Sequence, residues 1–236
     1  MEETNIILPD QIKCTCTQCD LKKLFFGNVG NLEMQLICDQ KIFRKYSKSQ
    51  IIIHEGDEIQ EFTYLKSGLV KLYRTSGDKE QIIHIAKPFD FVSILTIFSN
   101  SKYQYSVSAL EDTVTCNLKM DDIHKMILKN GTFASDLMRR MSEVSDRIIL
   151  EMLEVRKRNL KGRVAFILLY FADEIFNSMS FDLPVSRKEI AEWISMSTEN
   201  VIRSLSEFRQ DKVIKIFGKS IEIVNREDLE MISRLG

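Results

Sequence analysis

The hydrophobic period of the sequence changes near residue 120, and this change constrains the fold more than any other feature. Between about Gln40 and Met120 the chain carries short β-branched or aromatic runs, separated by glycine-containing pairs that favour tight turns. The runs are residues 51–53, 62–65, 69–73, 81–85 and 114–118. Beyond Met120 the apolar residues recur at steps of three and four, which is typical of helices. The sequence therefore predicts an α+β chain whose N-terminal part is an antiparallel β-roll, similar to a jelly roll.

The pattern inside one run predicts how the sheet is buried. Val70 and Leu72 share one face of their strand and Lys71 takes the other, as on a half-buried sheet. At 236 residues the chain suits one or two domains, and two is the better expectation.

Residues Asp121 to about Leu160 are expected to form a helix with one long apolar stripe, bent or broken near Gly131. The stripe consists of Ile123, Met126, Ile127, Leu137, Met141, Val144, Ile148, Met152 and Val155. Such a helix either lies on its own sheet or pairs with the same helix of a second copy. Because the stripe runs over about five turns after a compact β domain, we favour self-pairing in a dimer.

The C-terminal part predicts two short helices joined by a tight turn. A helix over residues 163–176 comes first. Ser186 and Glu189 then form a capping-box pattern that opens the next helix. Residues 195–197 form a three-residue turn, whose last residue, Ser197, is a natural N-cap for the helix that follows.

The last of these helices has two distinct faces. Val201, Leu205 and Phe208 lie at i, i+4 and i+7 and form an inward stripe. The polar side chains that must then point outward are those of Thr198, Glu199, Arg203 and Ser206. A period-two pattern over residues 213–224 follows, and it predicts a β-hairpin wing whose tip carries Lys219.

This arrangement is that of a helix-turn-helix, whose second helix enters the major groove of DNA. Glu199 can accept a hydrogen bond from cytosine N4, and Arg203 can donate two to guanine O6 and N7. Ser197 and the free amides of the helix N-terminus suit a phosphate. Lys219 at the wing tip is expected to bind DNA of any sequence alike. Taken alone, an exposed Glu/Arg pair four residues apart is usually a solvated ion pair worth about 0.2–0.5 kcal/mol. The cap, turn, inward stripe and wing occur in register, and together they favour DNA recognition.

The chain resembles the CRP/FNR family of bacterial transcription regulators over nearly its whole length. The matching stretches are residues 54–57, 65–68, 89–92 and 186–203. The resemblance implies a cyclic-nucleotide-binding-type β-roll, a long dimerisation helix and a C-terminal winged helix-turn-helix. It also implies a cytoplasmic homodimer without catalytic activity, which binds an inverted repeat in double-stranded DNA, works with RNA polymerase and needs no membrane.

The resemblance assigns roles to single residues. In the family, the residues that fall at Glu199 and Arg203 read a G·C pair in each half of the repeat, and the one at Thr198 helps to set which repeat is read. Arg187 and Ser197 match phosphate-contacting positions. The implied parts are a cysteine-containing segment over 1–30, the β-roll over 31–120, the dimerisation helix over 121–160 and the winged helix-turn-helix over 161–236.

Cyclic AMP is not expected as the effector. The members of the family that bind it hold the ribose and the cyclic phosphate with a Gly-Glu pair and an Arg-Ser pair. In this chain Ser93 and Ile94 stand in place of the Gly-Glu pair. Ser106 and Val107 stand in place of the Arg-Ser pair when a two-residue insertion is allowed. No arginine occurs in residues 77–119 to clamp the phosphate, and an isoleucine offers nothing to a ribose hydroxyl.

The cysteines suggest metal or redox chemistry rather than disulfides, because their number, five, is odd and the chain is long enough to form a core. The oxygen-sensing branch of the family holds a [4Fe–4S] cluster with three N-terminal cysteines and one in the β-roll. Cys16 and Cys19 match the first two, and Cys116 falls at the fourth. Phe25 occupies the third position, so Cys14 would have to supply the missing thiolate, since four are normally needed.

Other interpretations of the sensor stay open. The cysteines could act as a thiol redox sensor or have no function, and Cys38 is expected to be a small buried side chain. Haem is a further candidate, with His54, His84 and His124 as its ligands. For the whole protein, the alternative is a haem- or ligand-binding sensor whose C-terminal helices recognise a protein partner rather than DNA.

Composition and motifs exclude several other classes. The net charge of −1 gives no global basic excess, although a DNA-binding protein can be near neutral if its basic groups are local. Residues 1–20 hold no apolar signal region, and the longest apolar run, 164–172, is too short to cross a bilayer. No phosphate-binding glycine loop, Ser/His/Asp triad or zinc-type spacing is found, so an enzyme is not expected.

Overall fold

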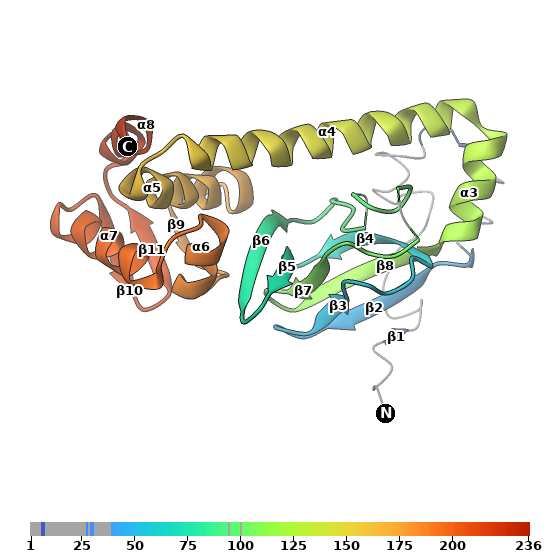
Figure 1. The fold of residues 1–236 in the computed structure, drawn as a ribbon, viewed down its shortest axis with the longest axis horizontal. Coiled ribbons are helices and arrows are strands. Elements are labelled where there is room, and N and C mark those ends of the chain that lie inside the picture. Colours follow the sequence, from blue (N-terminus) through green and yellow to red (C-terminus); the bar gives the residue numbers. More distant parts are fainter. Residues whose placement is uncertain (1–5, 8–26, 28, 31–38, 94, 100) are drawn as a thin grey trace. The chain divides into compact units, whose positions relative to one another are not determined.

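The structure is a computed structural model that describes residues 6–7, 27, 29–30, 39–93, 95–99 and 101–236 (Figure 1). The chain divides into two compact units, one comprising residues 1–74 and 84–146 and the other residues 75–83 and 147–236. A single helix, α4 (Gly131–Arg156), continues across the boundary at residue 146. The part boundaries predicted at residues 30, 120 and 160 stay predictions.

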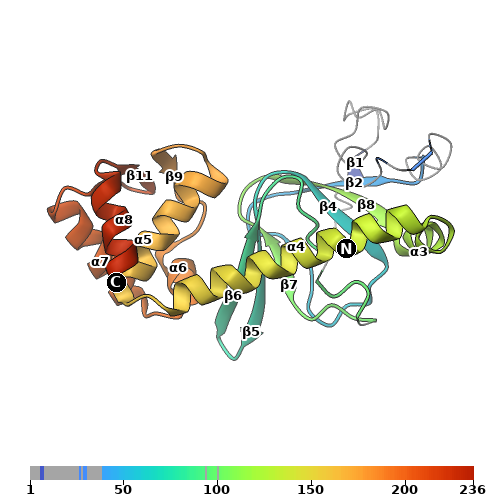
Figure 2. The ribbon, with the colours of Figure 1, turned by 90° about the horizontal axis from the view of Figure 1, so that it is seen from above.

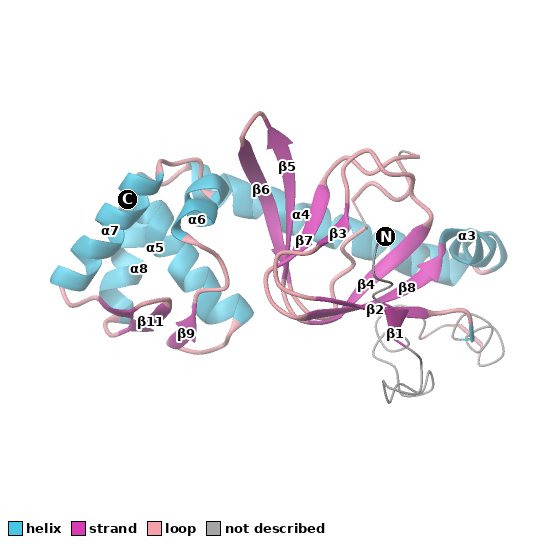
Figure 3. Cartoon of the chain, turned by 90° about the horizontal axis from the view of Figure 1, so that it is seen from below, coloured by secondary structure: helices cyan, strands magenta, loops and turns pink. Residues whose placement is uncertain are grey.

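Two four-stranded sheets form the N-terminal half of the protein (Figure 3). The first has the order β1-β2-β8-β4, with bounds Ile6–Ile7, Ile42–Tyr46, Thr113–Lys119 and Glu61–Ser67. The second has the order β3-β7-β5-β6, with bounds Ile51–Ile53, Ser106–Ala109, Val70–Ser76 and Lys79–Ala86. The strands pair antiparallel, as in β2–β8, β4–β8, β3–β7 and β5–β7. The predicted antiparallel β-roll is therefore confirmed.

All five predicted runs are in strands, but β1, β2 and β7 lie outside them. In β7, Ser106 and Ser108 alternate with Val107 and Ala109, and serine and alanine are not strong strand formers. This strand is held by its neighbours, since it pairs with β3 on one side and β5 on the other. Its own side chains carry too weak a pattern to predict it.

The prediction of a half-buried sheet is wrong at Lys71. Every residue from Val70 to Tyr73 is buried, and Lys71 itself is only 8% exposed. Its Nζ lies 5.0 Å from the centre of the Tyr73 ring, a cation–π contact that suits a cation removed from water. The alternation of the run identifies the strand correctly, but it does not tell what covers the second face.

Gly68, in the turn between β4 and β5, is required by its surroundings. It has φ +87°, which L side chains rarely adopt, and a Cβ there would lie 2.4 Å from Thr113 Oγ1. This close approach holds the β4–β5 turn against the start of β8.

The predicted helix break is confirmed at Asn130, between α3 (Met120–Lys129) and α4. Asn130 adopts an extended conformation, and its side-chain oxygen accepts a hydrogen bond from the amide of Phe133 at 3.0 Å. The residue that ends α3 thus also caps α4.

The first turns of α4 pack on their own sheet. Phe133 and Leu137 are buried in one apolar cluster with the sheet residues Phe43, Tyr64 and Cys116. Partly buried side chains of the predicted stripe pack against the same cluster, namely Met126, Ile127, Met141 and Val144. The alternative in which the helix covers its own sheet therefore holds for this half of the stripe.

The later turns of α4 expose a second apolar face. Ile149 is 54% exposed, Leu150 60% and Leu153 54%. None of the three belongs to the predicted stripe, whose members Ile148 and Val155 are buried. Exposed apolar side chains grouped at steps of three and four on one helix are typical of a surface that another helix covers.

The second unit is mainly helical, with one small sheet. Its helices are α5 (Leu160–Tyr170), α6 (Arg187–Trp193), α7 (Thr198–Gln210) and α8 (Arg226–Leu235). Its antiparallel sheet has the order β10-β11-β9, with bounds Ile214–Phe217, Ser220–Ile223 and Ser180–Asp182. Helices α5 and α8 pack side by side (Figure 2).

Three features of this unit differ from the predicted elements. The helix predicted over 163–176 begins at Leu160, and its last turn, Phe171–Ile175, is a π-helix. Strand β9 and helix α8 lie outside the predicted elements. No helix among the described residues is both long and apolar enough to cross a membrane.

Candidate nucleic-acid interface

Helix α6 begins with the predicted capping box. The Ser186 hydroxyl accepts a hydrogen bond from the Glu189 amide at 3.1 Å, and the Glu189 carboxylate accepts one from the Ser186 amide at 2.7 Å. Two amides that the helix itself cannot satisfy are thereby paired. The cap fixes where α6 starts, and with it the position of the turn that follows.

We expect Ser186→Ala to destabilise the winged domain by about 1 kcal/mol, because one of these amides loses its acceptor. Denaturant unfolding followed by the fluorescence of Trp193, the one tryptophan of the chain, measures this. Ser206→Ala, on α7, is the matched control. An unchanged unfolding midpoint for Ser186→Ala would contradict the role of the cap.

The turn between α6 and α7 has the predicted length. Ile194 ends α6, Ser195 has φ +54°, and Ser197 is the N-cap of α7. The Ser197 hydroxyl accepts a hydrogen bond from the Asn200 amide at 3.3 Å. The inward residues of α7, Val201, Leu205 and Phe208, are all buried, as predicted.

The outward face of α7 carries Glu199 and Arg203, both exposed, while Thr198 and Ser206 are half-buried. Hydrogen bonds from its own backbone amide and from Ser197 lower the pKa of the Glu199 carboxyl. Arg203 Nη2 donates to the side-chain oxygen of Asn200 at 2.9 Å. The carboxylate and the guanidinium thus each have a different partner.

Glu199 and Arg203 do not neutralise each other. Among the ion pairs of the described residues, none joins these two, although a spacing of four residues would permit it. Glu199 and Arg203 therefore do not form the solvated ion pair that their spacing alone would suggest. Both head groups remain at the surface, where a base edge can reach them.

Asn200 is a residue that sequence analysis missed. It lies between the two predicted base-reading residues, and only its side-chain contact to Arg203 reveals a role. A short amide side chain three residues before an arginine on a helix is the feature that could have indicated this contact.

We expect Asn200→Ala to weaken binding to the cognate site by a few-fold, because the guanidinium loses its support and becomes able to pair with Glu199. Fluorescence anisotropy with labelled DNA measures the change. Gln210→Ala, on an exposed residue of the same helix, is the control. Equal affinities for Asn200→Ala and the control would contradict this role.

The wing confirms the predicted hairpin and adds a third strand, β9. Gly218, with φ +63°, and Lys219 form the turn between β10 and β11. Lys219 is 74% exposed, and its Nζ lies 3.0 Å from a carboxylate oxygen of Asp182 on β9. The Ser220 hydroxyl donates to the same carboxylate, and both contacts lower the pKa of Asp182.

Arg187, which was predicted with Ser197 to contact phosphate, also contacts the wing. Its Nη2 donates to the carbonyl oxygen of Gly218 at 3.1 Å, and partial burial lowers its pKa. The first residue of α6 is thereby joined to the wing turn. The roles of Arg187 and Lys219 toward phosphate stay predictions, but both side chains lie at the end of the domain that carries the wing turn.

The predicted effector residues are mostly buried in the β-roll. Ser93 Oγ accepts a hydrogen bond from the Thr63 amide at 3.1 Å, and Ser106 Oγ accepts one from the Glu55 amide at 3.0 Å. Val107 is completely buried, and Ile94 lies outside the described residues. The two hydroxyl groups therefore hold the backbone of the roll together.

The predicted metal ligands are not brought together within the described residues. Cys14, Cys16 and Cys19 lie outside them, whereas Cys116 is on β8 and is 3% exposed. Within the part of the chain that the structure describes, no three His, Cys, Asp or Glu side chains are grouped to hold a metal ion. Of the histidines considered for haem, His84 is buried, and His54 and His124 are exposed.

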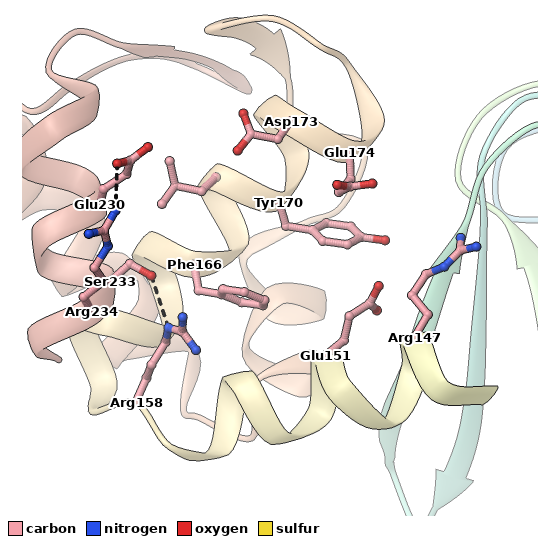
Figure 4. A pocket seen from close by; sticks show the side chains of 11 residues that line it. Arg147, Glu151, Arg158, Phe166, Tyr170, Asp173, Glu174, Glu230, Ser233 and Arg234 are labelled. Carbon is pink, nitrogen blue, oxygen red and sulfur yellow. Dashed lines mark hydrogen bonds and ion pairs between the residues drawn. The ribbon is translucent and has the colours of Figure 1, made fainter. Parts of the chain in front are cut away.

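The second unit also contains a cavity of about 560 Å³ that the sequence did not predict (Figure 4). Its walls come from the last turns of α4, from α5 with the π-helix, and from α8. Arg158 lies at its edge, stacked on the Phe166 ring. Such a cavity depends on helices distant in sequence, so no local pattern could indicate it.

Comparison with known proteins identifies both halves of the chain. The model of the cyclic nucleotide-binding domain matches residues 43–130, and that of the Crp-like helix-turn-helix domain matches residues 162–232. Together these matches span more than half of the sequence. The chain belongs to the CRP/FNR family. The predicted family and fold class are thereby confirmed.

Relatives of this CRP/FNR protein match it along most of their length. The transcriptional activator protein FnrL of Cereibacter sphaeroides is 25% identical over 225 residues, which span 92% of this chain and 86% of FnrL. The anaerobic regulatory protein of Aggregatibacter actinomycetemcomitans is 27% identical over 227 residues, or 92% and 87% of the two chains. These relatives are regulators, not enzymes, in line with the prediction for this CRP/FNR chain.

A solved structure supports the fold of this CRP/FNR chain. FixK2 from Bradyrhizobium japonicum superposes with a TM-score of 0.72 at 22% identity, and the match covers 80% of this chain and 96% of FixK2. At this identity the likeness shows the shared fold alone.

Proposed function

We propose that this CRP/FNR protein is a transcription regulator that binds an inverted repeat in double-stranded DNA as a homodimer. The observation that carries the proposal is the outward face of α7, on which Glu199 and Arg203 are both exposed and have separate partners. A carboxylate and a guanidinium one helical turn apart can together read one G·C pair. The Crp-like helix-turn-helix match over the same residues supports this role.

The exposed apolar face of α4 supports the proposed dimer. Ile149, Leu150 and Leu153 each expose more than half of their side chain, and a second copy of the helix would cover them. Two recognition helices related by a two-fold axis would then meet successive major grooves about 34 Å apart. FnrL is a transcriptional activator, and this likeness supports activation through RNA polymerase as the outcome of binding.

The test is DNA binding over a range of salt concentrations. A random-sequence selection should return an inverted repeat with a G·C pair in each half. Its affinity should fall steeply with salt, since phosphate neutralisation releases counter-ions. A salt-insensitive interaction with a protein and no binding to any DNA would instead favour the alternative, a sensor whose C-terminal helices recognise a protein.

We also propose that the cysteines sense the controlling signal, with a [4Fe–4S] cluster as the candidate cofactor. The supporting observation is Cys116, which belongs to the same buried cluster of side chains as Val29 and Phe43. Cys116 would supply one of the four thiolates that such a cluster needs, and Cys14, Cys16 and Cys19 would supply the others. The cluster, when bound, would supply oxygen-sensitive redox chemistry.

Anaerobic purification with iron, sulfide and absorption measurements tests this second proposal. Stoichiometric iron and sulfide that Cys16→Ala, Cys19→Ala and Cys116→Ala each abolish would support it. A sharp Soret band would point to haem instead. A colourless protein whose spectrum no cysteine substitution alters would overturn the cluster, and it would leave the DNA-binding proposal intact.

A further inference from the structure

The end of α4 is fastened to the winged domain by Arg158, two residues beyond the last residue of the helix (Figure 4). Its Nε donates to the Ser233 hydroxyl on α8 at 3.1 Å, and its Nη1 donates to the Glu154 carboxylate on α4 at 2.7 Å. The guanidinium also stacks on the ring of Phe166 on α5, 4.5 Å from its centre. One side chain thereby joins α4, α5 and α8.

Arg163 continues this connection to the helix-turn-helix. Its Nε donates to the backbone carbonyl of Arg158 at 3.0 Å, and its Nη1 donates to the backbone carbonyl of Ile194 at 3.1 Å. Ile194 is the C-cap of α6, directly before the turn that leads into α7. The guanidinium of Arg163 therefore bridges the end of α4 and the start of that turn.

Both carbonyls lie just past helices, where backbone oxygens have no partner within the helix. A guanidinium presents several donors in a rigid plane, so it can hold two separate acceptors at a fixed separation. Lysine keeps the charge but concentrates its donors on one atom, and it cannot reproduce this bridge.

We propose that Arg163 is a positioning residue that sets the direction of the recognition helix α7 relative to the end of α4. This inference rests on the proposed function, in which α4 holds the two copies together. In such a dimer the angle between α4 and α7 decides how far apart the two recognition helices meet the DNA. Arg163 therefore determines the spacing between half-sites that the protein accepts, without touching DNA itself.

A merely structural role for Arg163 makes a different prediction. If the side chain only helped the domain to fold, its replacement would weaken binding to every DNA alike, including a single half-site. A positioning role leaves the half-site interaction unchanged and alters only the preference among spacings. The ratio of affinities for different spacings separates the two.

The experiment uses the full-length protein and a set of DNAs with the same two half-sites. In one DNA the half-sites have the separation that the wild type prefers, and in the others this separation is one or two base pairs larger or smaller. A DNA with a single half-site completes the set. Wild-type protein should prefer one spacing strongly, because half-sites one helical turn apart match two recognition helices related by the two-fold axis of the dimer. For Arg163→Lys we expect the advantage of the preferred spacing to fall about tenfold, as the loss of a charge-assisted hydrogen bond implies. Half-site affinity should stay within about twofold of wild type.

Arg234→Lys, on α8, is the matched control, because Arg234 pairs with Glu230 and reaches neither carbonyl. An unchanged spacing preference for Arg163→Lys would overturn the inference, and so would a uniform loss across all the DNAs. Half-site affinity in the same samples shows whether the domain is folded. If the wild type itself bound no inverted repeat, the proposed function would fail first, and that result is distinct from the other two.

Discussion

Replacing Leu150 and Leu153 by glutamate is expected to leave the protein monomeric at micromolar concentration and to lower its affinity for an inverted repeat more than about 100-fold. Both leucines expose more than half of their side chain on the last turns of α4. In a dimer through this face, four carboxylates would be buried against apolar side chains and against each other, which costs several kcal/mol. Without the dimer, the second half-site no longer benefits from the binding of the first.

Sedimentation equilibrium measures the state of association, and fluorescence anisotropy measures the affinity for the repeat. Thr132→Glu is the control, because it adds a carboxylate at an exposed position in the first turn of the same helix, where an acid is well tolerated. A double variant that remained a dimer would show that another surface joins the two copies.

Arg203→Ala is expected to cost about 1–3 kcal/mol of binding free energy on the cognate repeat and to relax the choice of base at one position. The guanidinium is exposed and supported by Asn200, so its removal should leave the fold of α7 unchanged. The loss should be much smaller on DNA of scrambled sequence, because that DNA offers no guanine at the right place.

Competition binding with cognate, single-base-substituted and scrambled DNA measures this difference. Lys219→Ala is the matched comparison. The loss of a wing cation that faces phosphate should weaken all three complexes alike. Equal losses on cognate and scrambled DNA for Arg203→Ala would contradict its assigned role.

The parts that could be predicted from sequence are those fixed by residues close together in the chain. The capping box joins Ser186 to Glu189, and the inward stripe from Val201 to Phe208 repeats within a single helix. Such local patterns need only the geometry of a helix, so the helix-turn-helix was predictable to within a few residues.

The parts that could not be predicted depend on long-range contacts. Strand β7 is formed because two neighbours pair with it, and Lys71 is buried by the tertiary structure although its strand alternates. The bridge from Arg163 to Ile194 spans 31 residues, and no spacing rule indicates it. The N-terminal cysteines lie outside the described residues, so their role stays a prediction.

The pair formed by Lys219 and Asp182 has a consequence for how the protein searches a chromosome. The cation at the tip of the wing carries its own counter-ion, so a DNA phosphate has to compete with a carboxylate for it. Non-specific sites outnumber the regulatory ones by many orders of magnitude, and attraction to the phosphate backbone supplies essentially all of the binding to them. In the proposed complex with DNA, this ion pair would shorten each stay on the wrong sequence. The proposed base-reading residues of α7 would then decide where the protein stops.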